Sequence, residues 1–122
     1  MDFKELLAYQ KAFNLSMEIF EISKRFPKEE TYSLTDQIRR SSRSICANIV
    51  EAYRKRIYVK NFISKLTDSD GENSETAVWL DFALACDYIS MEEHQKMFDE
   101  TTEVGKLINY MVQHPGKFGC KE

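Results

Sequence analysis

Two histidines, three cysteines and many carboxylates are the side chains of this 122-residue chain that could perform chemistry, and their spacing fits no active-site pattern. Bundles that hold two metal ions use Glu-x-x-His pairs, yet neither His94 nor His114 has a Glu or Asp three residues before it. A phosphate-binding loop needs closely spaced glycines, and the four glycines lie apart at positions 71, 105, 116 and 119. We therefore expect no enzyme activity, no metal or other cofactor, and no small-molecule substrate.

The cysteines Cys46, Cys86 and Cys120 are odd in number and widely spaced, which argues against a disulfide framework and for a reducing, cytoplasmic location. Cys46 and Cys86 fall within helical patterns, so we interpret them as small buried hydrophobic residues, and no motif supports a Cys46–His dyad. The first residues contain no apolar segment typical of a signal peptide. No apolar run approaches the roughly 20 residues that span a membrane, so we expect no membrane association.

Basic residues are concentrated in one segment of an otherwise acidic chain. The net charge at pH 7 is −3, whereas residues 38–60 carry seven Lys and Arg side chains against the single Glu51. Such clusters bind phosphate-rich partners because each neutralised phosphate releases counterions, and Tyr53 and Tyr58 could stack on bases. Alternatively, the first three arginines pair with the acidic third and fourth helices, within or between subunits. The candidate partner-binding residues are Arg39, Arg40, Arg43, Arg54, Lys55, Arg56 and Lys60.

Four segments with apolar residues every three or four positions predict the helices that position these side chains. They cover about residues 3–26, 34–55, 59–88 and 91–113. Pro27 ends the first helix, and Ser90 with Glu93 forms a capping box at the start of the last. His114, Pro115 and Gly116 end that helix, and we expect the tail, residues 115–122, to be frayed. The prediction is a single all-α domain, an antiparallel up-down four-helix bundle.

The third segment carries a polar interruption at residues 68–73, Asp-Ser-Asp-Gly-Glu-Asn. Asp, Gly and Asn disfavour helix interiors, so composition alone leaves both a loop and a continuous helix open. In a continuous helix, the inward-facing side chains form a polar layer with the second helix and fix its register. The expected members of this layer are Ser44, Asn48, Ser69, Asp70 and Asn73. We interpret the lone Trp79 as an anchor in the core or in an interface.

The central residues resemble a specific signature. They are Phe26-Pro27, Glu30, Tyr32-Ser33-Leu34-Thr35, Gln37-Ile38-Arg39-Arg40-Ser41, Ser44-Ile45, Ala47-Asn48-Ile49 and Glu51, continued by Phe62-Ile63, Leu66, Gly71, Glu75, Leu80, Ala83-Leu84 and Tyr88-Ile89. The chain resembles the four-helix bundle proteins known as 23S rRNA intervening-sequence proteins. Ala52, Glu72 and the pair Val78-Trp79 depart from the residues common in that family. The resemblance implies that the third helix continues through residues 68–73.

The same resemblance implies assembly into a ring of identical subunits, with a homopentamer as the typical form. The family is similar to the accessory variability proteins of diversity-generating retroelements, which bind a reverse transcriptase and nucleic acid through a basic surface. We therefore predict a non-enzymatic homo-oligomeric bundle that binds RNA, DNA or a nucleic-acid enzyme through its basic helix. The alternative is a structural or protein-interaction scaffold without nucleic-acid binding.

Overall fold

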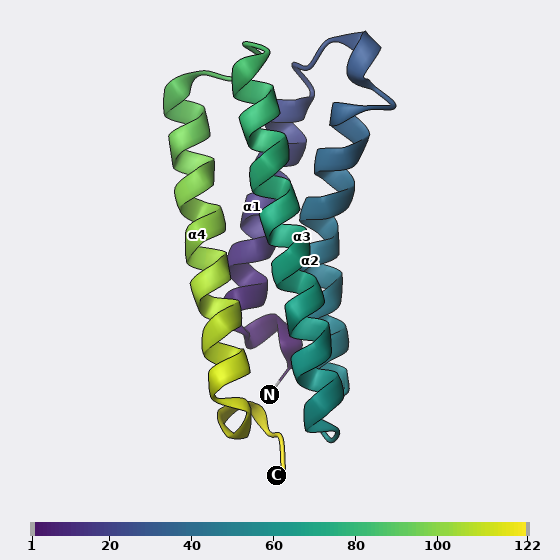
Figure 1. Cartoon of the computed structure of the whole chain (residues 1–122), viewed down its shortest axis with the longest axis vertical. Coiled ribbons are helices and arrows are strands. Elements are labelled where there is room, and N and C mark those ends of the chain that lie inside the picture. Colours follow the sequence, from purple (N-terminus) through teal and green to yellow (C-terminus); the bar gives the residue numbers. More distant parts are fainter. Residues whose placement is uncertain (1, 122) are drawn as a thin grey trace.

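The apolar segments of the sequence form four long helices in the computed structural model, which describes residues 2–121 (Figure 1). These are α1 (Leu7–Ser23), α2 (Leu34–Arg54), α3 (Val59–Ala85) and α4 (Met91–Gln113). Three short 3-10 helices accompany them: η1 (Phe3–Glu5) before α1, η2 (Lys28–Glu30) between α1 and α2, and η3 (Pro115–Phe118) after α4. Consecutive helices pack side by side, and α1 also packs against α4, so the four helices enclose one core. The fold is all-α, with adjacent helices arranged as in an antiparallel bundle, while the assembly of a ring stays a prediction.

The core consists of one apolar stripe from each helix. Its largest fully buried side chains include Leu15 and Ile19 of α1, Ile45 of α2, Phe62 of α3 and Ile108 of α4. Burying each of these removes apolar surface from water and contributes about 1.5–3 kcal/mol before conformational entropy is counted. Within the described residues, no helix is both long enough and apolar enough to span a bilayer.

Local hydrogen bonds decide where the helices begin and end. At the start of α4, Ser90 Oγ accepts from the Glu93 amide at 3.1 Å, and the Glu93 carboxylate accepts from the Ser90 amide at 2.8 Å, which confirms the predicted capping box. The first predicted helix is interrupted at Leu6, whose backbone is extended (φ −68°, ψ 124°), so α1 proper starts at Leu7. Helix α3 stops at Ala85 because Asp87 adopts a left-handed conformation (φ 62°), which Asp tolerates better than most residues.

Helix α3 is continuous through residues 68–73, and its inward polar residues form hydrogen bonds, although Asn73 Oδ1 has no partner in the described structure. Ser69 Oγ donates to the Ile45 carbonyl at 2.8 Å, and Asn73 Nδ2 donates to the Thr101 carbonyl of α4 at 2.8 Å. A further buried pair, Ser41 Oγ and Thr76 Oγ1 at 2.8 Å, joins α2 to α3 one turn away. These bonds remove the penalty of burying polar groups, so the polar interruption does not break the helix.

The other three expected members of the polar layer lie outside the bundle interior. Ser44 and Asn48 are only half-buried, and Asn48 Nδ2 donates to Ser44 Oγ at 3.2 Å on the flank of α2. Asp70 is exposed. The prediction misplaced them by one helical position, because each residue turns the helix by about 100° and their neighbours Ile45, Ile49 and Ser69 are the side chains that face inward.

The described part of the tail, residues 115–121, folds back onto the bundle, where the sequence predicted a frayed segment. Residues 115–118 form η3, and the Phe118 ring stacks on Phe62 of α3 with a centroid distance of 6.5 Å. Gly119 takes a positive φ of 93°, which turns the chain so that Cys120, only 7% exposed, returns to the core. The apolar side chains after Pro115 therefore close this end of the bundle.

Candidate interaction surfaces

One end of the bundle is rich in unpaired cations. Arg54 and Lys55 end α2, and Lys60 lies in the first turn of α3; all three are exposed, and none has a carboxylate partner among residues 2–121. The ordered tail adds Lys117 and Lys121 to the same end, because η3 packs against α3 (Figure 1). We call this set the basic end: Arg54, Lys55, Lys60, Lys117 and Lys121.

The prediction from sequence omitted Lys117 and Lys121, although an antiparallel topology indicates that they lie near the other basic residues. The end of α4 must lie beside the start of α3, which carries Lys60. Lys117 is partly anchored, since its Nζ donates to the Tyr110 hydroxyl at 2.8 Å, while its charge has no carboxylate partner within the described chain.

Arg56 differs from its basic neighbours because its side chain serves the fold. Its Nη1 donates to the Tyr53 carbonyl at 2.8 Å, and its guanidinium lies 4.0 Å from the centroid of the Tyr53 ring. Tyr53 is 7% exposed beneath it and therefore offers no open face for a base. Tyr58, in contrast, is 62% exposed at the basic end and keeps the stacking surface that the sequence suggested.

The acidic side chains nearest the basic end are engaged elsewhere. Glu51 pairs with Lys65 of α3 at 3.0 Å, and the hydrogen bond from Lys65 lowers the pKa of the Glu51 carboxyl. Glu5 closes a capping box with Asp2, accepting from the Asp2 amide at 2.9 Å. None of these carboxylates forms an ion pair with a cation of the basic end, although Glu51 attracts Lys55 electrostatically and Asp2 lines a hollow beside Arg54.

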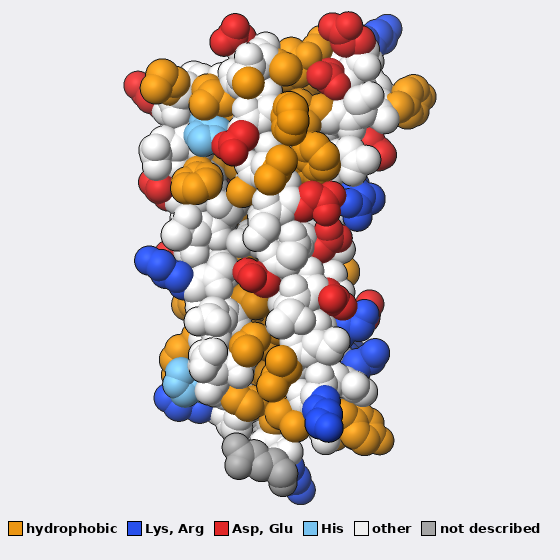
Figure 2. Space-filling view, in the orientation of Figure 1, with side chains coloured by type: hydrophobic (Ala, Val, Ile, Leu, Met, Phe, Trp, Pro, Cys, Tyr) orange, Lys and Arg blue, Asp and Glu red, His pale blue; other side chains and the backbone are white. Residues whose placement is uncertain are grey.

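The opposite end of the bundle has the reverse character. Two of its cations are paired, since Lys24 lies 3.2 Å from Glu21 and Arg25 lies 2.8 Å from Glu93, while Lys28 has no ion pair among the described residues. The hydrogen bond from Arg25 lowers the pKa of the Glu93 carboxyl. Figure 2 shows acidic side chains gathered at the upper end of the visible face and basic ones toward the lower end. The molecule is thus electrically polarised along its long axis.

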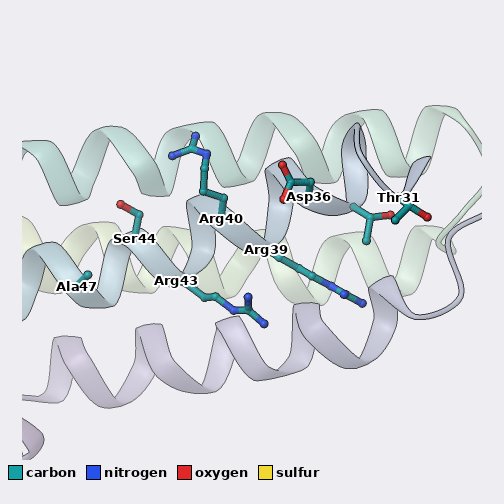
Figure 3. A pocket seen from close by; sticks show the side chains of 8 residues that line it. Thr31, Asp36, Arg39, Arg40, Arg43, Ser44 and Ala47 are labelled. Atoms are coloured by element: carbon teal, nitrogen blue, oxygen red, sulfur yellow. The ribbon is translucent and has the colours of Figure 1, made fainter. Parts of the chain in front are cut away.

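The three arginines in the first half of α2 are held in place by neighbouring side chains. Arg40 pairs with Glu72 at 3.3 Å and with Glu75 at 2.7 Å, which is the pairing with the third helix that the sequence allowed. Arg39 and Arg43 instead lie over the Phe20 ring of α1, with guanidinium carbons 4.8 and 5.7 Å from its centroid. Figure 3 shows Arg40 on one side of α2 and these two on the other.

Arg39 and Arg43 lack a carboxylate partner among the described residues. Arg39 Nε donates to Ser23 Oγ at 2.8 Å, and Arg43 has no comparable bond. A groove of about 510 Å³ lies beside them on α2 and includes Thr31, Asp36 and Ser44 in its lining (Figure 3). The structure therefore separates the predicted basic residues into a held group, Arg39, Arg40 and Arg43, and an open group at the basic end, Arg54, Lys55 and Lys60. The seventh residue, Arg56, serves the fold.

An apolar groove of about 500 Å³ continues from the held arginines between α1 and α2, sharing Arg43 and Ala47 with the first groove. Phe13 and Met17 on its rim are 47% and 46% exposed. We call the joined surface the α1–α2 seam: Phe13, Met17, Cys46, Ala47 and Val50, with Arg39 and Arg43 at one end. Burial raises the pKa of the Cys46 thiol to about 11, which suits a contact residue better than a nucleophile.

A second exposed apolar surface lies where η2 and the start of α2 meet the end of α3. We call it the α3 patch: Tyr32, Val78, Trp79 and Phe82, of which Tyr32, Trp79 and Phe82 line a hollow of about 400 Å³. Tyr32 is 93% exposed, and Trp79 Nε1 is buried without an acceptor in the described structure. The Tyr88 hydroxyl donates to Glu30 at 2.8 Å and fixes η2 beside α3. Large exposed apolar side chains of this kind mark interaction surfaces.

The two histidines border these surfaces, His94 beside Asp81 of α3 and His114 beside Tyr110, which accepts from Lys117 of the basic end. His94 Nε2 is 2.7 Å from Asp81 Oδ1 across the α3–α4 contact, and the His114 ring stacks on Tyr110 with a centroid distance of 4.2 Å. Among residues 2–121, no three His, Cys, Asp or Glu side chains gather in a way that could hold a metal ion.

Comparison with known proteins places the chain in a family. Its sequence matches the 23S rRNA-intervening sequence protein family over residues 4–110, which includes all four helices nearly to the end of α4. The chain belongs to this family. The resemblance seen in the central motif is thereby confirmed, and the motif maps mainly onto η2, α2 and α3.

A solved structure extends the likeness of this intervening-sequence protein to three dimensions. A protein of unknown function from the S23 ribosomal protein family of Bacteroides thetaiotaomicron VPI-5482 is similar, with 29% sequence identity and a TM-score of 0.79. The alignment covers 88% of this chain and 96% of that one. The search of functionally curated proteins found no match. Family membership therefore fixes the fold and leaves function to be inferred from the surfaces.

Proposed function

We propose that the protein is a non-enzymatic, self-associating bundle that binds nucleic acid, RNA or DNA, against its basic end. The observation that carries this proposal is the convergence of the basic end from two separate segments without neutralising carboxylates among the described residues. The chain has a net charge of −3, so most of the molecule repels phosphate. The cluster of unpaired cations raises the electrostatic potential at the basic end alone. Binding is therefore directed to one end of the bundle.

The chemistry of this end suits phosphate backbones and unstacked bases. Lys and Arg on flexible side chains neutralise successive phosphates and release their counterions, which contributes affinity without requiring a sequence. Tyr58 and Ile57, 62% and 69% exposed between the cations, present apolar surface to a base. We expect single strands to bind better than duplexes, because bases are accessible only in single strands.

Fluorescence anisotropy with labelled RNA and DNA oligonucleotides at low salt tests the proposal. The variant Arg54→Glu/Lys55→Glu/Lys60→Glu should lose at least about ten-fold in affinity, since three phosphate contacts become repulsive. The matched control Lys24→Glu/Arg25→Glu/Lys28→Glu makes the same charge change at the opposite end and should bind nearly as the wild type. Absence of wild-type binding at low salt, or equal losses in both variants, would overturn the proposal.

A second candidate function is a protein-interaction scaffold without nucleic-acid binding. It is favoured by the α1–α2 seam and the α3 patch, whose apolar side chains are more typical of protein contacts than of phosphate contacts. A stable oligomer by light scattering, combined with no affinity for any oligonucleotide, would select the scaffold over the first proposal.

A further inference from the structure

We infer that the α1–α2 seam of one copy of the chain binds the α3 patch of a second copy. The inference rests on the self-association contained in the proposed function and specifies the two surfaces that produce it. Both surfaces are exposed in the single chain, both combine apolar with charged groups, and they differ in the sign of that charge.

The seam has the dimensions and the chemistry of a receptor for a helix. Along α2 it extends from Arg39 to Val50, about 16 Å at 1.5 Å per residue, which accommodates three helical turns. One part is apolar, with Phe13 and Met17 about half exposed, and the other part presents the guanidinium groups of Arg39 and Arg43. A matching ligand is a helix with an apolar stripe bordered by carboxylates.

The outer side of α3 provides such a stripe. Glu75, Val78, Trp79 and Phe82 follow at spacings of three and four and therefore lie on one side of the helix. Val78 and Phe82 are 47% and 53% exposed, and the carboxylate of Asp81 is 65% exposed beside them. Apolar surface and negative charge are thus present together, as the seam requires.

Charge selects this pairing over the symmetric ones. Two seams facing each other would bring the unpaired Arg39 and Arg43 close to their own copies, and two patches would bring carboxylates together. Seam against patch places guanidinium groups beside Glu75 and Asp81. Glu75 shares the single Arg40 with Glu72, and Asp81 contacts His94, so the surplus negative charge on this side of α3 attracts the arginines. It also provides polar surroundings for Trp79 Nε1, which lacks an acceptor among the described residues.

The two surfaces lie on different sides of the bundle, because the seam is on the α1 side of α2 and the patch is on the α3 side. Each copy can therefore bind one neighbour through its seam and another through its patch. Such head-to-tail contacts produce a ring where the rotation closes, and an open filament where it does not.

The pairing is tested by light scattering on two variants, each of which carries new glutamates in only one of the two surfaces. Phe13→Glu/Met17→Glu blocks the seam and Val78→Glu/Phe82→Glu blocks the patch; we expect each variant alone to be monomeric. Mixed one to one, they retain one intact seam and one intact patch, so they should form a dimer of one copy of each. The control Met91→Glu/Phe98→Glu changes two exposed apolar side chains of α4 outside both surfaces and should assemble as the wild type.

Circular dichroism checks that every variant is helical. Arg39→Gln/Arg43→Gln, which removes both charges and keeps polar side chains, should weaken association by about ten-fold or more. A monomeric wild type would overturn self-association and this inference together. An oligomeric wild type whose seam or patch variants still assemble, or whose variants fail to combine when mixed, would overturn this inference alone and leave the self-association of the proposed function standing.

Discussion

Helix α2 carries two groups of basic residues that resemble each other in sequence and differ in their surroundings. Arg39, Arg40 and Arg43 contact an aromatic ring, a hydroxyl group or carboxylates on α1 and α3. Arg54 and Lys55 extend from the end of the helix without such partners in the described structure. A guanidinium fixed by its neighbours is preorganised for one contact geometry, whereas a free side chain adapts to many phosphate arrangements.

This difference shows why the position of a cation within the bundle matters more than the number of cations. The held arginines lie along the side of the bundle beside apolar side chains, which favours a protein contact. The basic end lies where two chain segments meet, which favours an extended polyanion. One helix can therefore serve assembly with its first half and ligand binding with its last turn.

The alkylation rate of Cys46 should show the largest effect, because it depends on how deeply this thiol is buried in the α1–α2 seam. Burial raises the pKa of Cys46 to about 11, so at pH 8 only about one molecule in a thousand carries the reactive thiolate. The rate of Cys46 alkylation should rise about ten-fold per pH unit up to pH 11, and exposed Cys86 should react first at pH 8. Mass spectrometry of alkylated peptides measures both rates, and equal rates at pH 8 would contradict the packing of the seam.

A smaller effect, a measurable loss of stability, is expected when Phe20 is replaced, because its ring lies beneath Arg39 and Arg43. Phe20→Ala loses partly buried apolar area and the cation–π contacts of Lys24, Arg39 and Arg43, so the free energy of unfolding should fall by about 1–2 kcal/mol. Tyr58→Ala at the basic end, where the ring is exposed, should change it by no more than about 0.5 kcal/mol. Urea unfolding measures both values, and similar losses in the two variants would remove the distinction between held and open groups.

The smallest effect is expected for the ion pairs of Arg40. Arg40→Ala breaks contacts to Glu72 and Glu75 that are half exposed and screened by water, so about 0.5–1 kcal/mol of stability should be lost. The loss should shrink at high salt. Arg54→Ala should leave the free energy of unfolding unchanged within about 0.3 kcal/mol, because its side chain has no ion pair or hydrogen bond among residues 2–121. A larger loss for Arg54→Ala than for Arg40→Ala in urea titrations would contradict the contacts described.

The sequence predicted the bundle well because apolar spacing and capping residues are local signals. The left-handed Asp87 that ends α3 early and the extended Leu6 that splits the first helix depend on tertiary packing, and spacing alone does not encode them. Ser69 and Asn73 face inward as expected, whereas Ser44, Asn48 and Asp70 were assigned one position out of phase. A helix pattern fixes a stripe only to within one residue when small and polar side chains alternate.

The interaction surfaces were predictable in part. The basic residues of α2 and of the α2–α3 link were evident from composition, since Glu51 is the only acid among them. Their separation into two groups was not evident, because it depends on Phe20 and Ser23 of α1 and on carboxylates of α3. Lys117 joins the basic end only because Phe118 packs on Phe62, a contact between residues far apart in the chain.

The salt dependence of nucleic-acid binding tests the central claim most directly, because it measures how many phosphates the basic end neutralises. The logarithm of the association constant should fall linearly with the logarithm of salt concentration for the wild type. In Arg54→Glu/Lys55→Glu/Lys60→Glu, the magnitude of that slope should drop by about 2–3, with the oligomer mass unchanged. An unchanged slope in this variant, or no measurable binding by the wild type at low salt, would contradict the account.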